Sequence, residues 1–202
     1  MVEFGDYQRT SCGAFARDTE PALIRRYVDT GVVRLVWRDF PWVDAQSVSA
    51  AVGARAAGLQ GKFWAYHDYL SAHQFPDEHS GLVTGGYLRS VTRRLVLNMT
   101  MFNRDVTGPA LAAAVRADDA FGQQLGVPGT PAFLIGGRPF FGAQPLPAFE
   151  AAIAQSRRGP LSCVNESEPL PSVLSYLRGS AIELEPPRSV AGLATTSASS
   201  SG

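Results

Sequence analysis

The sequence offers two thiols for chemistry, Cys12 and Cys163, and they lie far apart along the chain. Two cysteines are too few for a disulfide scaffold, and they leave no cysteine cluster for structural zinc. The thiolate is the reactive form of cysteine, and nearby charge and burial decide how much of it is present. Each thiol must therefore be judged by its own surroundings.

A proline in a tight turn is the second feature with a chemical meaning. Pro131 follows Thr130 and directly precedes the apolar segment 132–135. Prolines in tight turns adopt the cis form more often than others, although in most proteins such a proline is trans and only structural. We predict a cis Thr130–Pro131 bond.

Three histidines, His67, His73 and His79, recur every six residues. On a helix this spacing turns each side chain away from the last, so the three do not converge as metal ligands. His67 is better explained as a packed or capping residue. Residues 53–62 contain glycines and a lysine but lack the spacing of a phosphate-binding loop. We predict no metal site and no cofactor.

The segments around Cys12 alternate between strand and helix. Residues 1–4 have the pattern of a short strand, and Phe15 to Arg26 carry apolar residues at helical spacing. Val32 to Trp37 is a β-branched and aromatic run, which is typical of a strand. The chain therefore opens with a βαβ unit.

A long helical region and a second sheet unit follow. Residues 44–125 are rich in Ala, Leu, Arg and Gln and are interrupted by glycine-containing breaks, which predicts three or four helices. Ala132 to Ile135, a Gly136-Gly137 turn and residues 139–141 predict a hairpin. Pro145 to Gln155 predict a last helix, with prolines near its start.

Several stretches resemble one known family. Residues 2–8 followed by Arg-Thr-Ser-Cys-Gly at 9–13 resemble the segment that runs into the Cys-Pro-x-Cys motif of DsbA-like thiol–disulfide oxidoreductases of the DsbA/BdbD type. Residues 126–133 and 142–145 are similar to the family's Thr-cisPro segment and its continuation. Residues 61–68 resemble a helix of the family's insertion. The resemblance covers about residues 2–158.

The resemblance implies the fold and the roles of the site residues. It implies an α/β thioredoxin fold over residues 1–159, interrupted by a helical insertion subdomain at about 44–125. Cys12 stands at the position of the resolving cysteine, and Arg9 stands at the position of the attacking one. Thr130 and Pro131 correspond to the segment that pairs with substrate peptide. The implied partners are protein or peptide thiols and disulfides, with an unknown redox partner protein.

The departure from the family motif decides the expected mechanism. A guanidinium, with a pKa above about 12, cannot form a bond to sulfur, so ordinary dithiol exchange is excluded at Arg9. Cys12 either acts as a lone thiol or is a small buried apolar residue. We predict a family member that is redox-impaired. The alternative is a non-catalytic module that binds peptides or proteins beside Pro131.

Arg9 also raises an electrostatic question. A cation at a helix N-terminus is unfavourable by about 0.3 to 1 kcal/mol unless an anion compensates. Asp6 or a bound anion is one candidate for this compensation. The simpler expectation is that Arg9 projects into water.

Composition and the chain ends complete the predictions. Acidic and basic residues balance, so we expect no nucleic-acid partner. The first residues lack a signal-peptide pattern, which predicts a cytoplasmic protein by default. The family, in contrast, is typically extracytoplasmic or membrane-anchored. A start codon assigned too late is the hypothesis that would reconcile the two. Residues 160–202 have the composition of a disordered tail, from which Cys163 reaches Cys12 only by folding back.

Overall fold

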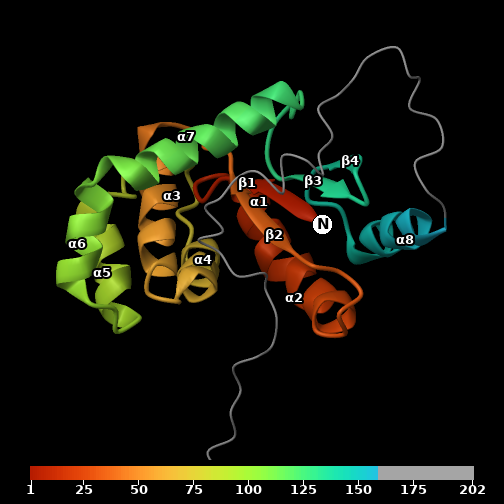
Figure 1. Cartoon of the computed structure of the whole chain (residues 1–202), viewed down its shortest axis with the longest axis horizontal. Coiled ribbons are helices and arrows are strands. Elements are labelled where there is room, and N and C mark those ends of the chain that lie inside the picture. Colours follow the sequence, from red (N-terminus) through yellow and green to blue (C-terminus); the bar gives the residue numbers. More distant parts are fainter. Residues whose placement is uncertain (159–202) are drawn as a thin grey trace, which may run out of the picture.

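A four-stranded sheet lies at the centre of the computed structural model, which describes residues 1–158 (Figure 1). Its strands are β1 (Val2–Gly5), β2 (Val36–Asp39), β3 (Ala132–Ile135) and β4 (Arg138–Phe141), in the order β2-β1-β3-β4. β1 runs parallel to β2 and antiparallel to β3, and β3 and β4 form an antiparallel hairpin. The predicted α/β class and thioredoxin fold are confirmed.

One long helix and the last helix cover one face of the sheet. The long helix is continuous from Thr10 to Val28 and consists of α1 (Thr10–Ala14), the π-helical turn η1 (Phe15–Thr19), α2 (Glu20–Leu23) and the π-helical turn η2 (Ile24–Val28). The last helix is α8 (Leu146–Arg157). Their shared core with the sheet is built from eight buried residues: Phe15, Leu23, Val28, Leu35, Phe133, Ile135, Phe149 and Ile153.

The opposite face of the sheet packs against α7 (Pro109–Gln124). Phe4 on β1 contacts Phe121 of α7, and Val2 belongs to the same buried cluster. Successive side chains of a strand point to opposite faces, so Glu3 must point toward the long helix. Its register partners are Trp37 and Phe133, and Phe133 belongs to the core on that side. The Glu3 carboxylate thus lies within the apolar face of the sheet that packs against the long helix.

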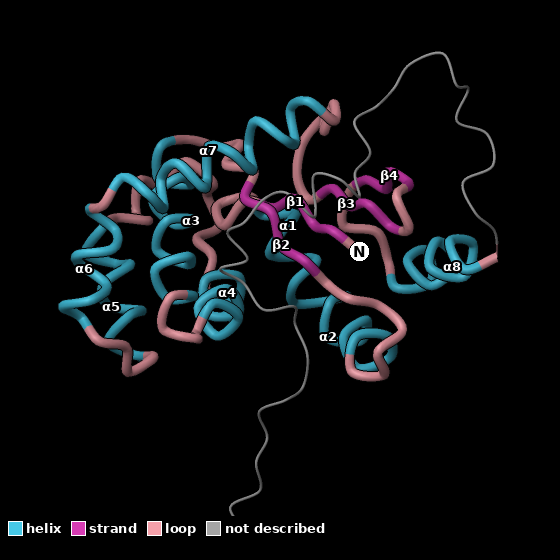
Figure 2. The backbone as a smooth tube through the Cα atoms, viewed as in Figure 1, coloured by secondary structure: helices cyan, strands magenta, loops and turns pink. Residues whose placement is uncertain are grey.

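The insertion forms a helical subdomain beside the sheet, as Figure 2 shows. It contains α3 (Ala45–Gly58), α4 (Phe63–Ala72), α5 (Gly85–Arg94), α6 (Met99–Thr107) and α7. These are five helices, so the prediction of three or four was too low. The additional break lies at Val96, which has a φ of 56°, and at Asn98, whose side chain accepts a hydrogen bond from the Met101 amide and caps α6.

A buried charge cluster joins the sheet to the insertion. Arg55 of α3 donates from Nε to Asp39 of β2 and from Nη2 to Asp118 of α7. Arg38 donates to the other oxygen of Asp118 at 2.8 Å, and the Trp37 indole donates to Asp39 at 2.8 Å. Because the carboxylates are buried, each depends on these donors for compensation. The cluster holds α3, α7 and β2 together.

The long helix starts earlier than its pattern predicts. Its first residue is Thr10 and not Phe15. The apolar spacing did not show this first turn, because its residues are polar or small and contact the loop of residues 73–84. Pro21 lacks the N–H that an α-helix requires in its interior, and π-helical turns lie on both sides of the short α2. The local register of this helix was therefore not predictable from spacing alone.

Within residues 1–158, no helix combines the length and apolar character needed to cross a membrane. The predicted tail at 160–202 and Cys163 lie outside the described residues.

Candidate functional site

Residues 9–13, the proposed motif, form the N-cap and the first turn of the long helix. Arg9 is the N-cap residue, with φ −68° and ψ 115°, and its carbonyl accepts from the amides of Cys12 at 3.0 Å and Gly13 at 3.2 Å. Asp6 accepts from the Arg9 amide through its own carbonyl at 3.2 Å. Cys12 therefore lies in the first turn of the helix, on its buried side.

Cys12 is a buried free thiol, 5% exposed. Burial raises the pKa of the Cys12 thiol far above its ordinary value, and the charges of Glu3 and Asp6 act in the same direction. The Asp6 backbone and the Thr130 side chain lower it to a smaller extent. Because the thiolate is the nucleophile, this burial lowers the share of the Cys12 thiol that is in the reactive form.

Two buried carboxylates lie behind the motif. Glu3 is 1% exposed and Asp6 is 2% exposed. One Asp6 oxygen accepts from the amides of Trp42 at 2.7 Å and Val43 at 2.9 Å, and the other accepts from the Gln8 amide at 2.8 Å. Burial raises the pKa of Asp6 despite these amides, which act to lower it. Asp6 therefore orders the loops around the motif and is not the partner of the Arg9 side chain.

Glu78 is the residue that compensates Arg9. Its Oε2 accepts from Arg9 Nη1 at 2.9 Å, and its Oε1 accepts from the Thr10 amide at 2.8 Å and the Thr10 hydroxyl at 2.7 Å. Partial burial acts to raise the pKa of Glu78, but the Thr10 hydrogen bonds and the Arg9 charge outweigh it and hold that pKa below its ordinary value. The expectation that Arg9 simply projects into water was wrong, and Glu78 takes the place of Asp6, which was one of the two candidates for the compensating group.

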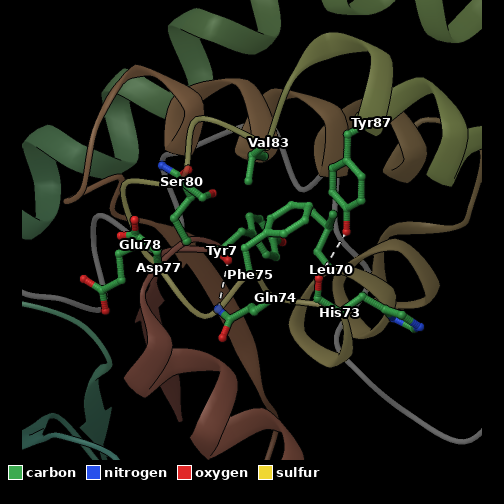
Figure 3. Close-up of a pocket in the computed structure, with 11 residues that line it drawn as sticks. Tyr7, Leu70, His73, Gln74, Phe75, Asp77, Glu78, Ser80, Val83 and Tyr87 are labelled. Atoms are coloured by element: carbon green, nitrogen blue, oxygen red, sulfur yellow. Dashed lines mark hydrogen bonds between the residues drawn. The ribbon is translucent and has the colours of Figure 1, made fainter.

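The loop of residues 73–84 carries Glu78 and packs closely against the motif (Figure 3). Gln74 donates from Nε2 to the carbonyls of Tyr7 at 2.8 Å and Arg9 at 2.9 Å. A Cβ at Gly13 would lie 1.7 Å from the Gln74 side-chain oxygen, so only glycine fits there without movement of Gln74. The cavity enclosed by this loop has a volume of about 10 Å³, room for about one water molecule. The loop is a packed support and leaves no ligand pocket beneath it.

The Thr130–Pro131 bond is cis, which confirms the prediction. Both residues are buried, and the Ser11 hydroxyl donates to the Thr130 carbonyl at 3.0 Å. The turn that precedes β3 is thereby fixed directly beside the motif, although the two are 119 residues apart along the chain. The structure thus brings Arg9, Cys12, Thr130 and Pro131 into one site.

The three histidines do not come together. His67 is 1% exposed among aromatic rings, with Trp37 and Trp64 at centroid distances of 4.7 and 5.3 Å. His73 stacks on Tyr69, and His79 is an exposed residue 3.8 Å from Asp44.

Sequence reasoning missed Glu3, Glu78 and Gln74 as residues of this site. Glu3 was detectable, because a charged residue in the middle of an apolar strand is unusual. Glu78 and Gln74 lie in a polar loop whose path cannot be inferred from local pattern, so nothing in the sequence indicated that they contact the motif.

Comparisons with known proteins place this arrangement in a family. The family model described as Thioredoxin matches residues 1–155. The chain belongs to the thioredoxin family. The thioredoxin-family chain is 27% identical over 140 residues to Probable disulfide bond formation protein D of Bacillus anthracis, which is 68% of this chain and 64% of that protein. Its fold matches the structure of oxidised BdbD from Bacillus subtilis with a TM-score of 0.72, at 22% identity over 78% of this chain and 86% of that chain. It is therefore a DsbA-like member of the family.

A second kind of relative carries a different name. The chain is 34% identical over 162 residues to Na(+)/H(+) antiporter NhaA 1 of Salinispora arenicola (strain CNS-205), covering 79% of this chain but 23% of that protein. The chain thus spans less than a quarter of the antiporter and just under two thirds of the Bacillus anthracis protein. Ion transport in that relative carries no information about the thioredoxin-family domain.

Proposed function

We propose that this chain has the scaffold of a thiol–disulfide oxidoreductase, acts on protein or peptide thiols and disulfides, and is impaired in dithiol exchange at its own motif. The observation that carries the proposal is the site itself. Cys12 lies buried beside the cis Thr130–Pro131 bond, while Arg9 occupies the partly exposed position at the start of the same helix.

The chemistry explains the impairment. In dithiol exchange, an attacking thiolate bonds to one sulfur of a substrate disulfide, and the other sulfur leaves as a thiolate. A second thiol of the enzyme then attacks the mixed disulfide, releases the substrate and leaves an enzyme disulfide. Arg9 supplies no sulfur for the first step. Cys12 supplies one, but its burial and raised pKa leave almost no thiolate to attack.

Substrate recognition rests on a different part of the site. Thr130 and Pro131 are the candidate substrate-binding residues, because an extended peptide can pair with the backbone beside a cis-proline turn. Ser11 holds the Thr130 carbonyl by a hydrogen bond, so the turn is rigid. The kinship with proteins named for disulfide bond formation favours an oxidoreductase scaffold over the alternative of a binding module.

The test is the exchange rate with a model disulfide peptide, measured on the chain as it stands, Arg9→Cys and Arg9→Ala. Arg9→Ala removes the ion pair with Glu78 without adding sulfur, so it is the matched control. Of the two variants, only Arg9→Cys should show a rate increase, of at least about 100-fold, because a thiol at a helix N-terminus has a lowered pKa and is accessible. Equal activity of the unchanged chain and Arg9→Cys, abolished by Cys12→Ser, would show that Cys12 is a competent lone thiol and would contradict the proposal.

A further inference from the structure

A group of three side chains with metal-binding chemistry comes from α2 of the long helix and from α4 of the insertion. Glu20 comes from α2, and His67 and Asp68 come from α4. One possible ligand atom from each of these residues lies within 4.8 Å of the others. The sequence prediction of no metal site was based on the spacing of the three histidines. It did not include carboxylates, and one of the two carboxylates here comes from another helix.

The three residues differ in exposure, so one side of the group is open. Glu20 and His67 are 2% and 1% exposed, whereas the Asp68 side chain is 49% exposed. The Asp68 carboxylate is 3.3 Å from His67 Nδ1, and the ring of His67 is fixed by its aromatic neighbours Trp37 and Trp64. The His67 ring is therefore fixed in the interior, Glu20 is buried near it, and Asp68 can adjust at the surface.

A cavity of about 300 Å³ adjoins the group. Glu20 and Asp68 both line it, together with Arg17 and Ser71. Arg17 directs Nη1 to the Ser71 carbonyl at 2.7 Å, which gives this guanidinium a partner other than the two acids. The cavity has room for several water molecules or a small ligand beside the carboxylates.

The donor set indicates the class of ion. One imidazole nitrogen and two carboxylate oxygens suit borderline divalent ions such as Zn²⁺, whereas a site for Ca²⁺ uses oxygen ligands throughout. Metal–ligand distances of about 2.0–2.2 Å require ligand atoms within about 4 Å of each other. The three ligand atoms lie within 4.8 Å of one another, so shifts of about 1 Å bring them into this range.

From this geometry we propose that Glu20, His67 and Asp68 bind a divalent transition-metal ion whose remaining coordination positions face the adjoining cavity. The ion joins α2 of the thioredoxin half to α4 of the insertion. The proposal is independent of the redox chemistry at Arg9 and Cys12.

The first test is calorimetric titration of ZnCl₂ into the untagged, chelator-treated full chain at neutral pH, followed by melting curves with and without Zn²⁺. We expect one saturable site and a higher Tm with Zn²⁺, since an ion bound only by the folded state stabilises it. The absence of saturable binding, or a site that accepts Ca²⁺ but not Zn²⁺, would overturn the proposal.

Matched variants assign the ligands. Asp68→Asn is the main variant because its side chain is half exposed and tolerates change, and we expect it to weaken Zn²⁺ binding at least about 10-fold. Asp29→Asn, which alters another exposed acid outside the group, should leave the affinity unchanged. Equal affinity in Asp68→Asn and the unchanged chain would contradict the assignment.

A spectroscopic measurement distinguishes these ligands from the two thiols. Co²⁺ bound by nitrogen and oxygen shows visible d–d absorption without the intense near-ultraviolet band of a thiolate–cobalt bond. We expect the first pattern in the full chain, and the same spectrum in Cys12→Ser and Cys163→Ser. A thiolate band that disappears in either serine variant would place the ion at a cysteine and overturn the proposal.

Discussion

Arginine meets carboxylates at two places that differ in burial. At the start of the long helix, the Arg9 and Glu78 side chains are 39% and 19% exposed. Between the sheet and the insertion, Arg55 and Asp39 are 5% and 1% exposed. An exposed pair contributes little and can be exchanged, whereas removal of one partner from a buried pair leaves the other charge without compensation. The motif position therefore tolerates a new residue, while the buried cluster is a fixed joint between the two halves of the molecule.

The largest expected effect comes from breaking the buried cluster. Arg55→Ala leaves Asp39 and Asp118 buried with one cationic partner fewer, and we expect a loss of about 3–5 kcal/mol in the free energy of unfolding. Urea denaturation followed by circular dichroism measures it. Arg26→Ala, which breaks the exposed pair with Glu150, is the control and should cost less than about 1 kcal/mol. Similar losses in the two variants would remove the distinction between the sites.

A smaller effect is expected at the helix start. Glu78→Ala removes the acceptor of the Thr10 amide and hydroxyl, which is the capping interaction of α1, and should cost about 1 kcal/mol. Glu78→Gln keeps one oxygen acceptor but removes the charge, so its loss should be smaller. In a double-mutant cycle with Arg9→Ala, the coupling energy should stay below about 1 kcal/mol because solvent screens the pair. A coupling of several kcal/mol would show that the pair behaves like the buried cluster.

The smallest expected effect is a pH dependence of opposite sign at two carboxylates. The pKa of Glu78 is lowered in the folded state, so its ionised form stabilises the fold above the unfolded value of about 4.3, and this contribution is lost as the pH falls through the folded pKa. The pKa of Asp6 is raised, so the folded state holds its proton longer and stability decreases as the pH rises through that window.

Denaturation at a series of pH values checks these signs. The stability difference between the unchanged chain and Glu78→Gln should shrink on acidification. The difference between the unchanged chain and Asp6→Asn should change in the opposite sense. The same trend at both positions would contradict the environments described for the two carboxylates.

The order of elements was predictable from the sequence because each half of the fold has a local signature. The strand at Val2–Gly5, the hairpin around Gly136-Gly137 and the final helix follow from alternation, turn residues and capping prolines. The split between α5 and α6 was not predictable, because a β-branched residue such as Val96 rarely adopts positive φ. The insertion was therefore recognised as helical but divided into too few helices.

The candidate site was predictable only where sequence carries a motif. Arg9, Cys12, Thr130 and Pro131 were identified from the resemblance, and the structure places them together. Glu78 was not identified, because it reaches Thr10 across 68 residues from a loop without regular periodicity. The early start of the long helix was missed for the same reason, since its cap comes from that distant loop and not from a neighbouring side chain.

The long-range pairing of β1 also determines when Cys12 becomes shielded during synthesis. A chain emerges from the ribosome N-terminus first. Val2 pairs with Leu134 and the Thr10 amide donates to Glu78, and both partners are synthesised later. Contacts between residues so far apart form late, because the intervening loop must first be closed. The Cys12 thiol is consequently open to oxidants and to other nascent chains until most of the domain has been made. The burial of Cys12 is a property of the completed fold and is absent from the growing polypeptide.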